Sequence, residues 1–162
     1  MVGEGDRCQG PFCTLPDENG EQITLSALRG SPVVLYFYPA DDTTGCTTQA
    51  CGIRDVYGEF ERAGAVVLGV SPDDEASHVR FKEKYRLPFT LLADTDHAVA
   101  ERYGAWGEKA RDGKTYEGLV RSTWVIDPDG TVVSAMPNVR PETHADDVLA
   151  VLASMQPRAA SS

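Results

Sequence analysis

The sequence predicts an α/β fold, a three-layer sandwich in which helices flank both faces of a central mixed sheet. The first indication is segment 33–38, Val-Val-Leu-Tyr-Phe-Tyr, a continuous β-branched and aromatic run that is typical of a strand buried on both faces. A polar loop at 39–45 follows it, then a helical pattern over 46–60, and then a second apolar strand at 65–70. A strand, a helix and a strand in this order predict two parallel strands joined by a right-handed crossover.

The later part of the chain continues this alternation and adds a hairpin. Asp127-Pro-Asp-Gly130 is a strong turn signal between two apolar segments, so these segments are expected to pair antiparallel and to make the sheet mixed. The remaining predicted elements are helices at 74–86, 97–103 and 146–155, a third parallel strand at 89–92, and the two hairpin strands at 122–126 and 131–136.

Length and composition are those of one ordinary globular domain. The chain has 162 residues, of which 41% are hydrophobic and 25% are charged, and no repeat or linker divides it. We therefore expect a single domain over residues 1–156. The last segment, Pro-Arg-Ala-Ala-Ser-Ser at 157–162, offers little to pack against a core, so it is expected to be a disordered tail.

The formal net charge of −10 argues against two classes of partner. Nucleic acids and anionic lipid surfaces are bound by clustered Lys and Arg side chains, and an acidic chain repels both. The longest apolar run, at 33–38, is far shorter than the roughly 20 residues needed to cross a bilayer. Met1 is followed by Val-Gly-Glu-Gly-Asp, which lacks the basic start and apolar segment of a secretory signal peptide. We expect a cytoplasmic protein that binds neither nucleic acid nor membranes.

The four cysteines are the candidates for chemistry, because cysteines in a reducing compartment are more often catalytic, metal-binding or buried than permanently crosslinked. Cys46 falls at the junction of the polar loop and the first helix, where Thr43 or Thr44 can cap and the early backbone N–H groups lack intrahelical partners. The partial positive charge of a helix N-terminus favours a thiolate. Cys46 is therefore a candidate nucleophile.

Two observations weigh against a reactive Cys46. The residue continues an apolar stripe of the helix with Ala50 and Ile53, so a small buried hydrophobic side chain is the alternative interpretation. Asp41 and Asp42 also disfavour a nearby thiolate unless they point away or a cation offsets their charge. A reactive Cys46 therefore requires a positively charged partner.

Cys51 lies about 140° around the same helix from Cys46, on its polar face with Arg54 and Asp55. Five residues of helix hold the two cysteine Cα atoms roughly 8 to 9 Å apart. A disulfide bridges at most about 7 Å without backbone movement. A bond between Cys46 and Cys51 would therefore require the start of the helix to unwind, which suits a catalytic cycle better than a permanent crosslink.

Segment 34–51, Val-Leu-Tyr-Phe-Tyr-Pro-Ala-Asp-Asp-Thr-Thr-Gly-Cys-Thr-Thr-Gln-Ala-Cys, resembles the active-site signature of peroxiredoxins, specifically the peroxiredoxin Q or bacterioferritin comigratory protein subgroup. The core of that signature, P-x-x-x-T-x-x-C, is met by Pro39, Thr43 and Cys46, and a resolving cysteine five positions further on matches Cys51. The resemblance covers nearly the whole chain. Later segments that share it are Trp106-Gly-Glu-Lys109, Gly113-Lys-Thr-Tyr116 and Arg121-Ser-Thr-Trp-Val-Ile-Asp127.

The resemblance implies a thioredoxin-like fold and a thiol-dependent peroxidase that reduces hydrogen peroxide and organic hydroperoxides. Cys46 would form a sulfenic acid that condenses with Cys51 into an intramolecular disulfide, the atypical 2-Cys cycle, and a thioredoxin-type dithiol would reset it. Arg121 would supply the required cation by stabilising the thiolate and polarising the peroxide. Thr43 would orient the attacked oxygen, and Pro39 would shield the site from water. We expect a monomer that needs neither cofactor nor metal.

The chain departs from the subgroup at a few positions. Position 44 is Thr where the family usually has Pro, and position 124 is Trp where it usually has Phe. The opening at 5–15 replaces the usual G-D-x-A-P-D-F and adds Cys8 and Cys13. These two cysteines repeat the C-x4-C spacing, and the Gly-Pro turn between them could bring them together as a disulfide. Otherwise they are incidental thiols.

Two other functions compete with the peroxidase. A metal-binding module would use all four cysteines, Cys8, Cys13, Cys46 and Cys51, but zinc pairs usually show a C-x2–4-C spacing, and the last two point apart on their helix. A thiol–disulfide oxidoreductase or redox sensor would use the same helix, but the C-x-x-C of a thioredoxin-like exchanger is missing.

The histidines carry no recognisable spacing of a metal pair or of a Cys–His dyad. His78, His97 and His144 all fall in polar, helix-like stretches, so the sequence favours surface positions for all three. The charged run at 75–86 is similarly interpreted as the solvated face of a helix.

Overall fold

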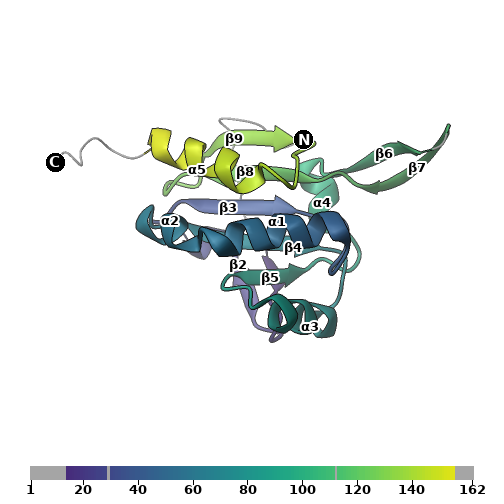
Figure 1. Cartoon of the computed structure of the whole chain (residues 1–162), viewed down its shortest axis with the longest axis horizontal. Helices are drawn as coiled ribbons and strands as arrows, with labels where there is room; N and C mark the ends of the chain where they lie inside the picture. The colour runs from purple at the N-terminus through teal and green to yellow at the C-terminus, as the bar shows by residue number, and fades with distance from the viewer. Residues whose placement is uncertain (1–13, 29, 112, 156–162) are drawn as a thin grey trace.

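The apolar segment at 33–38 forms the middle strand of a five-stranded sheet with the order β5-β4-β3-β8-β9 (Figure 1). β4 pairs in parallel with β3 and β5 in parallel with β4, whereas β8 and β9 continue the sheet antiparallel on the other side of β3. The predicted mixed sheet is therefore confirmed. The strands are β3 (Val33–Phe37), β4 (Val66–Ser71), β5 (Thr90–Ala93), β8 (Ser122–Ile126) and β9 (Val132–Pro137).

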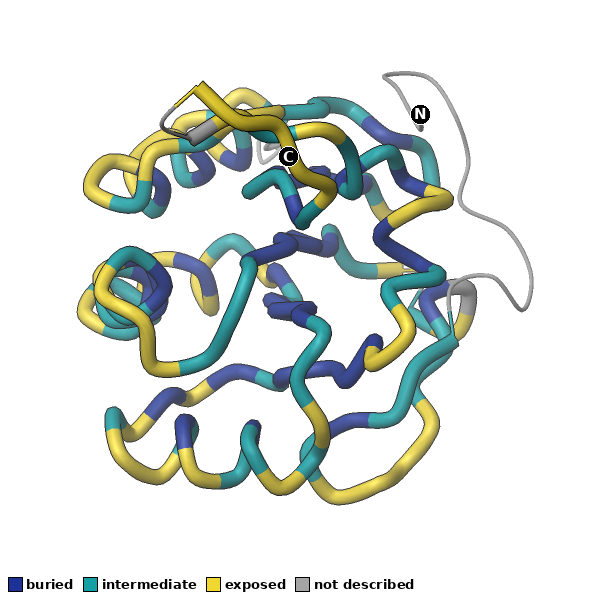
Figure 2. The backbone as a smooth tube through the Cα atoms, turned by 90° about the vertical axis from the view of Figure 1, so that its right-hand side faces the viewer, coloured by how far each residue is buried: buried dark blue, intermediate teal, exposed yellow. Residues whose placement is uncertain are grey.

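Helices cover both faces of this sheet, with α1 and α5 in front of it and α4 behind it in Figure 1. α1, α2, α3 and α5 share one hydrophobic core with the sheet, and α4 shares the second core on the opposite face. In Figure 2 the buried strands lie between these layers. None of the helices described is long and apolar enough to cross a membrane. The helices are α1 (Thr44–Asp55), α2 (Tyr57–Arg62), α3 (Glu75–Tyr85), α4 (Ala98–Tyr103) and α5 (His144–Met155).

The structure is a computed structural model that describes residues 14–28, 30–111 and 113–155. The tail predicted at 157–162 lies outside the described residues. Cys8 and Cys13 also lie outside them, and so does the disulfide considered for that pair.

The alternation of side chains along β3 builds the two cores. Leu35 and Phe37 point into the core shared with α4, whereas Tyr36 and Tyr38 point into the core shared with α1. All four side chains are at most 4% exposed, and burial of each stabilises the fold by about 1.5–3 kcal/mol. Trp124 of β8 is fully buried and packs at right angles to Phe37, with ring centroids 5.5 Å apart. The Trp at a position where the family usually has Phe thus belongs to the core.

Three features differ from the sequence-based expectation. The single helix predicted over 46–60 is two helices, because Val56 leaves helical geometry (φ −120°, ψ 24°) between α1 and α2. Two hairpins were not predicted: β1 (Thr14–Pro16) with β2 (Gln22–Thr24), and β6 (Trp106–Arg111) with β7 (Lys114–Leu119). Both hairpins have a turn signal in the sequence, the pairs Asn-Gly at 19–20 and Asp-Gly at 112–113.

Two histidines contradict the surface positions favoured by the sequence. His78 and His144 are both 0% exposed, while His97 is partly exposed and stacks on Trp106 with ring centroids 3.7 Å apart. His144 Nε2 shares a hydrogen bond of 2.7 Å with Thr123 Oγ1. A histidine in a polar helical pattern can be buried when the fold supplies such partners, and no local pattern reveals them.

Gly69 of β4 provides a test of the core, because it lies opposite Tyr36 of β3. A methyl group there would lie 3.0 Å from the Tyr36 hydroxyl oxygen and 3.1 Å from Leu91 Cδ2. Gly69→Ala is expected to lower the free energy of unfolding by about 1–3 kcal/mol through overpacking, as measured by urea denaturation. In the control Gly58→Ala in α2, the added methyl group meets no atom within 4 Å. This substitution is expected to raise the free energy of unfolding by about 0.5–1 kcal/mol. Equal effects of the two substitutions would contradict this packing.

His144 makes the stability depend on pH. Burial lowers the pKa of His144 to about 4, against the 6.5 of the unfolded chain, and Arg121 acts in the same direction while Asp147 opposes it. As pH falls below 6.5, His144 binds a proton in the unfolded chain but stays neutral in the folded chain. The free energy of unfolding is therefore expected to be about 2 kcal/mol lower at pH 5 than at pH 8. His144→Gln is expected to remove this part of the acid sensitivity in urea denaturation between pH 5 and pH 8. An unchanged pH slope would contradict the neutral, buried imidazole.

Candidate active site

Cys46 lies in the first turn of α1, at the end of the loop that leaves the middle strand of the sheet. Thr43 is at the N-cap position, with an extended backbone (φ −91°, ψ 160°), but the side-chain cap that the sequence predicted from Thr43 or Thr44 is not formed. The Thr43 hydroxyl makes no capping bond and instead donates a hydrogen bond of 3.0 Å to the Ala40 carbonyl oxygen. The first N–H groups of α1, including that of Cys46, are therefore left for a ligand or for solvent.

Arg121 brings the positive charge that a reactive Cys46 requires. The residue precedes β8, and its Nη1 donates a hydrogen bond of 3.3 Å to Cys46 Sγ. Cys46 is only 1% exposed, so the attraction between the guanidinium and a thiolate is weakly screened by water. The position of Arg121 beside Cys46 thus satisfies the electrostatic condition set by the sequence.

Two residues of α1 fix the direction of the Arg121 guanidinium. Gln49, which is fully buried, accepts a hydrogen bond of 2.7 Å from Nη1 through its Oε1. Gly45 lets the guanidinium lie close to the helix, because a methyl group at Gly45 would be 2.9 Å from Nη2. Sequence reasoning did not single out either residue, although both stand within the signature segment.

The two aspartates that weighed against a thiolate are both engaged elsewhere. Asp41 accepts hydrogen bonds from the Tyr38 hydroxyl at 2.6 Å and the Ser77 hydroxyl at 2.7 Å. Asp42 pairs with Lys84 at 2.8 Å and accepts a bond of 2.7 Å from the Tyr85 hydroxyl, and these bonds lower the pKa of Asp42. α3 thus holds both carboxylates away from the sulfur.

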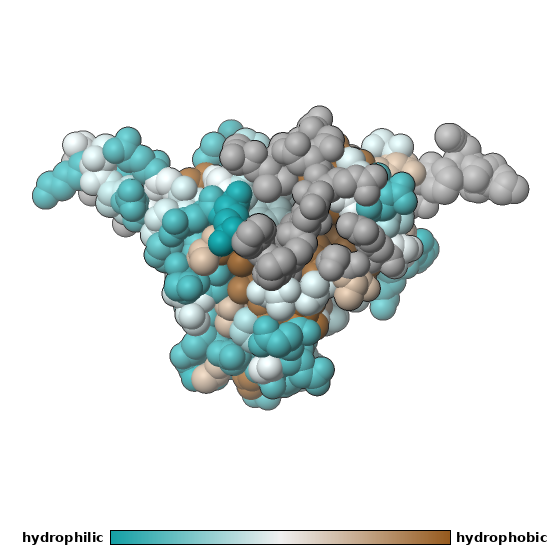
Figure 3. All heavy atoms as spheres, turned by 180° about the vertical axis from the view of Figure 1, so that it is seen from behind, coloured by the Kyte–Doolittle hydropathy of each residue, from teal (hydrophilic) through white to brown (hydrophobic). Residues whose placement is uncertain are grey.

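An open cleft of about 530 Å³ has Arg121 in its lining, whereas Cys46, the hydrogen-bond partner of Arg121, is buried behind it and is not among the lining residues. Pro39, Thr43 and Gly45 form its α1 side, and Arg121 lies in its wall. The opposite side comes from the β6–β7 hairpin, which projects beyond the body of the protein in Figure 1 and presents a mostly hydrophilic surface at the left of Figure 3. Because the hairpin was not predicted, its contribution to the cleft was missed. The hairpin residues in the lining are Trp106, Lys109, Tyr116, Gly118 and Leu119.

Cys51 lies on the same continuous helix as Cys46, and both thiols are free. Cys51 is partly exposed, in agreement with the polar face predicted for it. Intact helical geometry keeps the two Cα atoms roughly 8 to 9 Å apart. The structure therefore places Pro39, Thr43 and Arg121 in the lining of one cleft, with Cys46 in contact with Arg121, and leaves Cys51 out of direct reach of Cys46.

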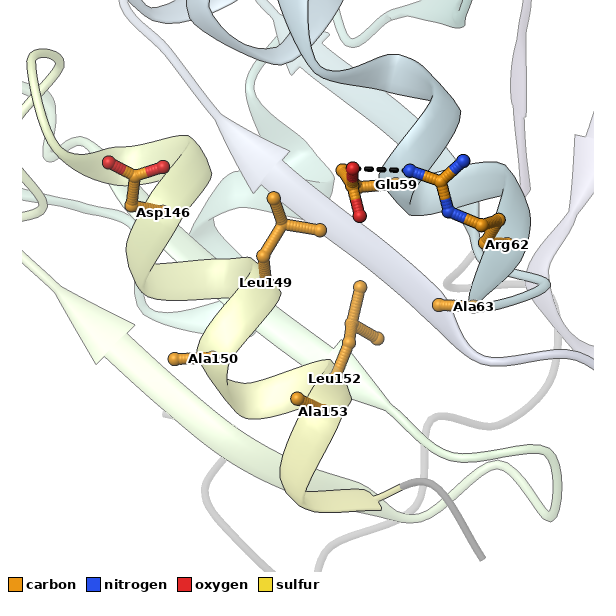
Figure 4. A pocket seen from close by; sticks show the side chains of 8 residues that line it. All are labelled: Glu59, Arg62, Ala63, Asp146, Leu149, Ala150, Leu152 and Ala153. Carbon is orange, nitrogen blue, oxygen red and sulfur yellow. Dashed lines mark hydrogen bonds and ion pairs between the residues drawn. The ribbon is translucent and has the colours of Figure 1, made fainter. Parts of the chain in front are cut away.

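A second hollow, of about 540 Å³, lies between α2 and α5 (Figure 4). Apolar side chains such as Leu149 and Leu152 line it, together with the ion pair of Glu59 and Arg62. It contains no cysteine or histidine in its lining, and thus no nucleophile of the kind found at Cys46. Elsewhere in the described part of the chain, no group of three or more His, Cys, Asp or Glu side chains is placed to hold a metal ion.

Comparison with known proteins agrees with the geometry of this site. A model of the AhpC/TSA family matches residues 7–135, and the chain belongs to this family. Peroxiredoxin Bcp of Escherichia coli strain K12 is 47% identical over 139 residues, which cover 86% of this chain and 89% of that protein. Peroxiredoxin Bcp of Bacillus subtilis strain 168 is 42% identical over 147 residues, with coverages of 91% and 94%.

Solved structures place the chain in the same subgroup and confirm the thioredoxin-like peroxiredoxin fold. Peroxiredoxin Q of Xanthomonas campestris aligns with a TM-score of 0.87 and 38% identity, covering 96% of this chain and 99% of that chain. A further structure of the bacterioferritin comigratory protein of Xanthomonas campestris, with a TM-score of 0.87 and 38% identity over 94% and 98% of the two chains, concerns its alkyl peroxide reduction activity. The resemblance to peroxiredoxin Q and bacterioferritin comigratory proteins is therefore confirmed.

Gly45 offers a test of the Arg121–Cys46 contact. The methyl group of Gly45→Ala would displace the end of the flexible Arg121 side chain rather than the backbone. Alkylation of Cys46 by iodoacetamide at pH 7, followed by peptide mass spectrometry, is expected to slow about 3- to 10-fold because a charge-assisted hydrogen bond is weakened. The control Gly52→Ala in the same helix makes only an ordinary contact of 3.9 Å with Ala145 and should alkylate at the rate of the wild type. Equal rates for both variants would contradict a role of this contact.

Proposed function

We propose that this protein is a thiol peroxidase of the atypical 2-Cys type, with Cys46 as the peroxidatic cysteine and Cys51 as the resolving cysteine. The observation that carries the proposal is the Arg121 Nη1 donor 3.3 Å from Cys46 Sγ, beneath an open cleft. A guanidinium in this position favours a thiolate and can also bind the oxygens of a hydroperoxide entering the cleft. The substrates are hydrogen peroxide and organic hydroperoxides, consistent with the alkyl peroxide reduction of the Xanthomonas relative.

The first step uses the buried Cys46 together with its partner Arg121 and other groups that line the cleft. The Cys46 thiolate attacks one oxygen of the peroxide; the S–O bond forms, the O–O bond breaks, and the leaving alkoxide or hydroxide takes a proton to become an alcohol or water. Thr43 lines the cleft and is proposed to orient the attacked oxygen. Pro39 lines the same wall and is proposed to limit the access of water to the sulfur. The unpaired N–H of Cys46 at the start of α1 adds a donor for the substrate.

The second step needs a change in conformation. The Cys51 thiolate attacks the sulfur of the Cys46 sulfenic acid; the S–S bond forms, the S–O bond breaks, and the leaving hydroxide takes a proton to become water. Because intact helix keeps the two Cα atoms too far apart for a disulfide, the first turns of α1 must unwind. The missing side-chain cap at Thr43 supports this, since an uncapped helix start opens more easily.

The cycle requires an external reductant. A thioredoxin-type dithiol would attack the Cys46–Cys51 disulfide and return both cysteines as thiols while it becomes oxidised. We further propose that the protein works as a single-domain monomer in the cytoplasm, where such reductants are maintained. The proposed steps use only thiol, sulfenic acid and disulfide chemistry and involve neither a metal nor an organic cofactor.

The function is tested by coupled peroxide consumption with thioredoxin, thioredoxin reductase and NADPH. Cys46→Ser is expected to lose turnover completely. Cys51→Ser is expected to consume about one equivalent of peroxide and then stop, because its sulfenic acid cannot be resolved within the chain. Variants of Cys8 and Cys13 are the matched controls and should turn over like the wild type. Turnover retained by Cys46→Ser would refute the proposal.

The linkage in the oxidised protein is a separate test of the resolving cysteine. Mass spectrometry after one equivalent of hydrogen peroxide is expected to find Cys46 joined to Cys51. A bond between Cys8 and Cys46 would assign resolution to Cys8 instead. Slow peroxide turnover together with rapid disulfide exchange would favour a redox sensor or an oxidoreductase.

A further inference from the structure

A buried polar cluster lies directly beneath the loop that forms the α1 side of the cleft. Its centre is Asp41, whose side chain is 4% exposed, paired with His78 of α3, whose side chain is 0% exposed. The distance from His78 Nδ1 to Asp41 Oδ2 is 2.7 Å. None of the steps proposed for the peroxidase uses this pair. Because burying two charged groups costs free energy of desolvation, the pair is a candidate for a functional role.

The hydrogen bonds of His78 define its protonation state. Its Nδ1 meets the Asp41 carboxylate, and its Nε2 lies 2.8 Å from the Leu92 carbonyl oxygen in β5. A carboxylate and a carbonyl can only accept, so both ring nitrogens must donate, and the ring is an imidazolium. A neutral ring carries one N–H and would leave either Asp41 or the Leu92 carbonyl without its donor.

The polar groups around this pair come from several elements, and three of them favour the protonated ring. The Asp41 carboxylate also accepts from the Tyr38 hydroxyl of the segment after β3 and from the Ser77 hydroxyl of α3. The Asp41 backbone N–H donates 2.7 Å to Asp73 of the β4–α3 connection, a second carboxylate that faces the imidazolium. Burial lowers the pKa of His78, but Asp41, the Leu92 carbonyl and Asp73 together outweigh it, so the pKa lies above the usual value.

This cluster reaches the reacting groups through one short loop. Asp41 stands two residues from both Pro39 and Thr43, which line the cleft, and the Thr43 hydroxyl is bonded to the Ala40 carbonyl next to Asp41. Hydrogen bonds from three elements hold the carboxylate and the N–H of Asp41. They therefore also restrain the Pro39–Thr43 wall of the cleft, against which the peroxide would lie. Asp42, one residue further on, is held by the exposed Lys84 and the partly buried Tyr85, so Asp41 is the more deeply buried anchor of the loop.

We infer that His78 is a positioning residue for the peroxidatic step: its imidazolium holds Asp41 and, through it, the Pro39–Thr43 wall of the cleft in the geometry that the hydroperoxide requires. The inference rests on the proposed peroxidase function and adds to it a residue on a different helix. It also makes the wall sensitive to alkaline pH, because deprotonation of the ring breaks one of its two bonds.

The state of the ring can be measured in the wild type without any substitution. Nitrogen-15 NMR of the histidine rings at pH 7 is expected to show both nitrogens of His78 protonated. A neutral His78 ring at pH 7 would overturn the inference. This measurement does not depend on peroxidase activity, so its outcome is separate from that of the proposed function.

The role of the ring is tested with His78→Gln, which keeps one donor to Asp41 but has no charge and cannot bridge to Leu92. The rate constant for the reaction of Cys46 with hydrogen peroxide is expected to fall roughly 10-fold at pH 7, the scale of a small misplacement of reacting groups. Alkylation of Cys46 by iodoacetamide does not need the cleft wall and should stay within about twofold of the wild type. A parallel fall of both rates would overturn positioning in favour of an effect on the thiolate.

The pH profile distinguishes positioning from a merely structural role. The peroxide rate constant of the wild type is expected to decline on the alkaline side as His78 loses its proton, and His78→Gln should lack this limb. Ser77→Ala is the matched control: it removes another donor to the same Asp41 oxygen, keeps the imidazolium, and should keep the alkaline limb. A pH profile of His78→Gln that coincides with that of the wild type would overturn the inference. A wild-type protein that does not react with peroxide at any pH would instead overturn the proposed function.

Discussion

The contact between Arg121 and Cys46 is the interaction on which the rest of the site depends. A thiol in the first turn of a helix, close to two aspartates in sequence, is an ambiguous nucleophile until a cation is placed beside it. Arg121, the residue just before β8, supplies that cation, and β8 pairs with the middle strand of the sheet. Because Cys46 is buried, a single guanidinium acts at short range with little screening.

Placing that cation imposes demands on neighbouring residues. Gly45 leaves the space that the guanidinium occupies beside α1, and the buried Gln49 accepts a hydrogen bond from it. The carboxylates must be held away from the sulfur, and α3 does this at both of its ends, with His78 for Asp41 and Lys84 for Asp42. The peroxiredoxin site is therefore an electrostatic arrangement of α1, α3 and β8 rather than a property of one loop.

The same helix has to satisfy two opposed requirements. Its first turn must be folded to give Cys46 a donor-rich environment and a neighbour in Arg121, yet it must open if Cys51 is to reach the oxidised sulfur. The uncapped start of α1 and the break at Val56 limit the helix to a short unit between them. The buried Asp41–His78 pair anchors the loop before it, so the opening can be confined to α1 itself.

The sequence by itself determined the layers of the fold and its parallel and antiparallel strands, because these follow from local periodicity. The contiguous signature singled out Pro39, Thr43 and Cys46 as candidates, and the family resemblance of a later segment singled out Arg121. The sequence did not determine the β6–β7 side of the cleft, although an Asp-Gly pair marked the turn. Only the tertiary structure decided which charged and polar groups lie side by side, since the partners of Asp41 and Arg121 come from elements distant in the chain. For the same reason, His78 is a surface residue by pattern and a buried partner of Asp41 in the fold.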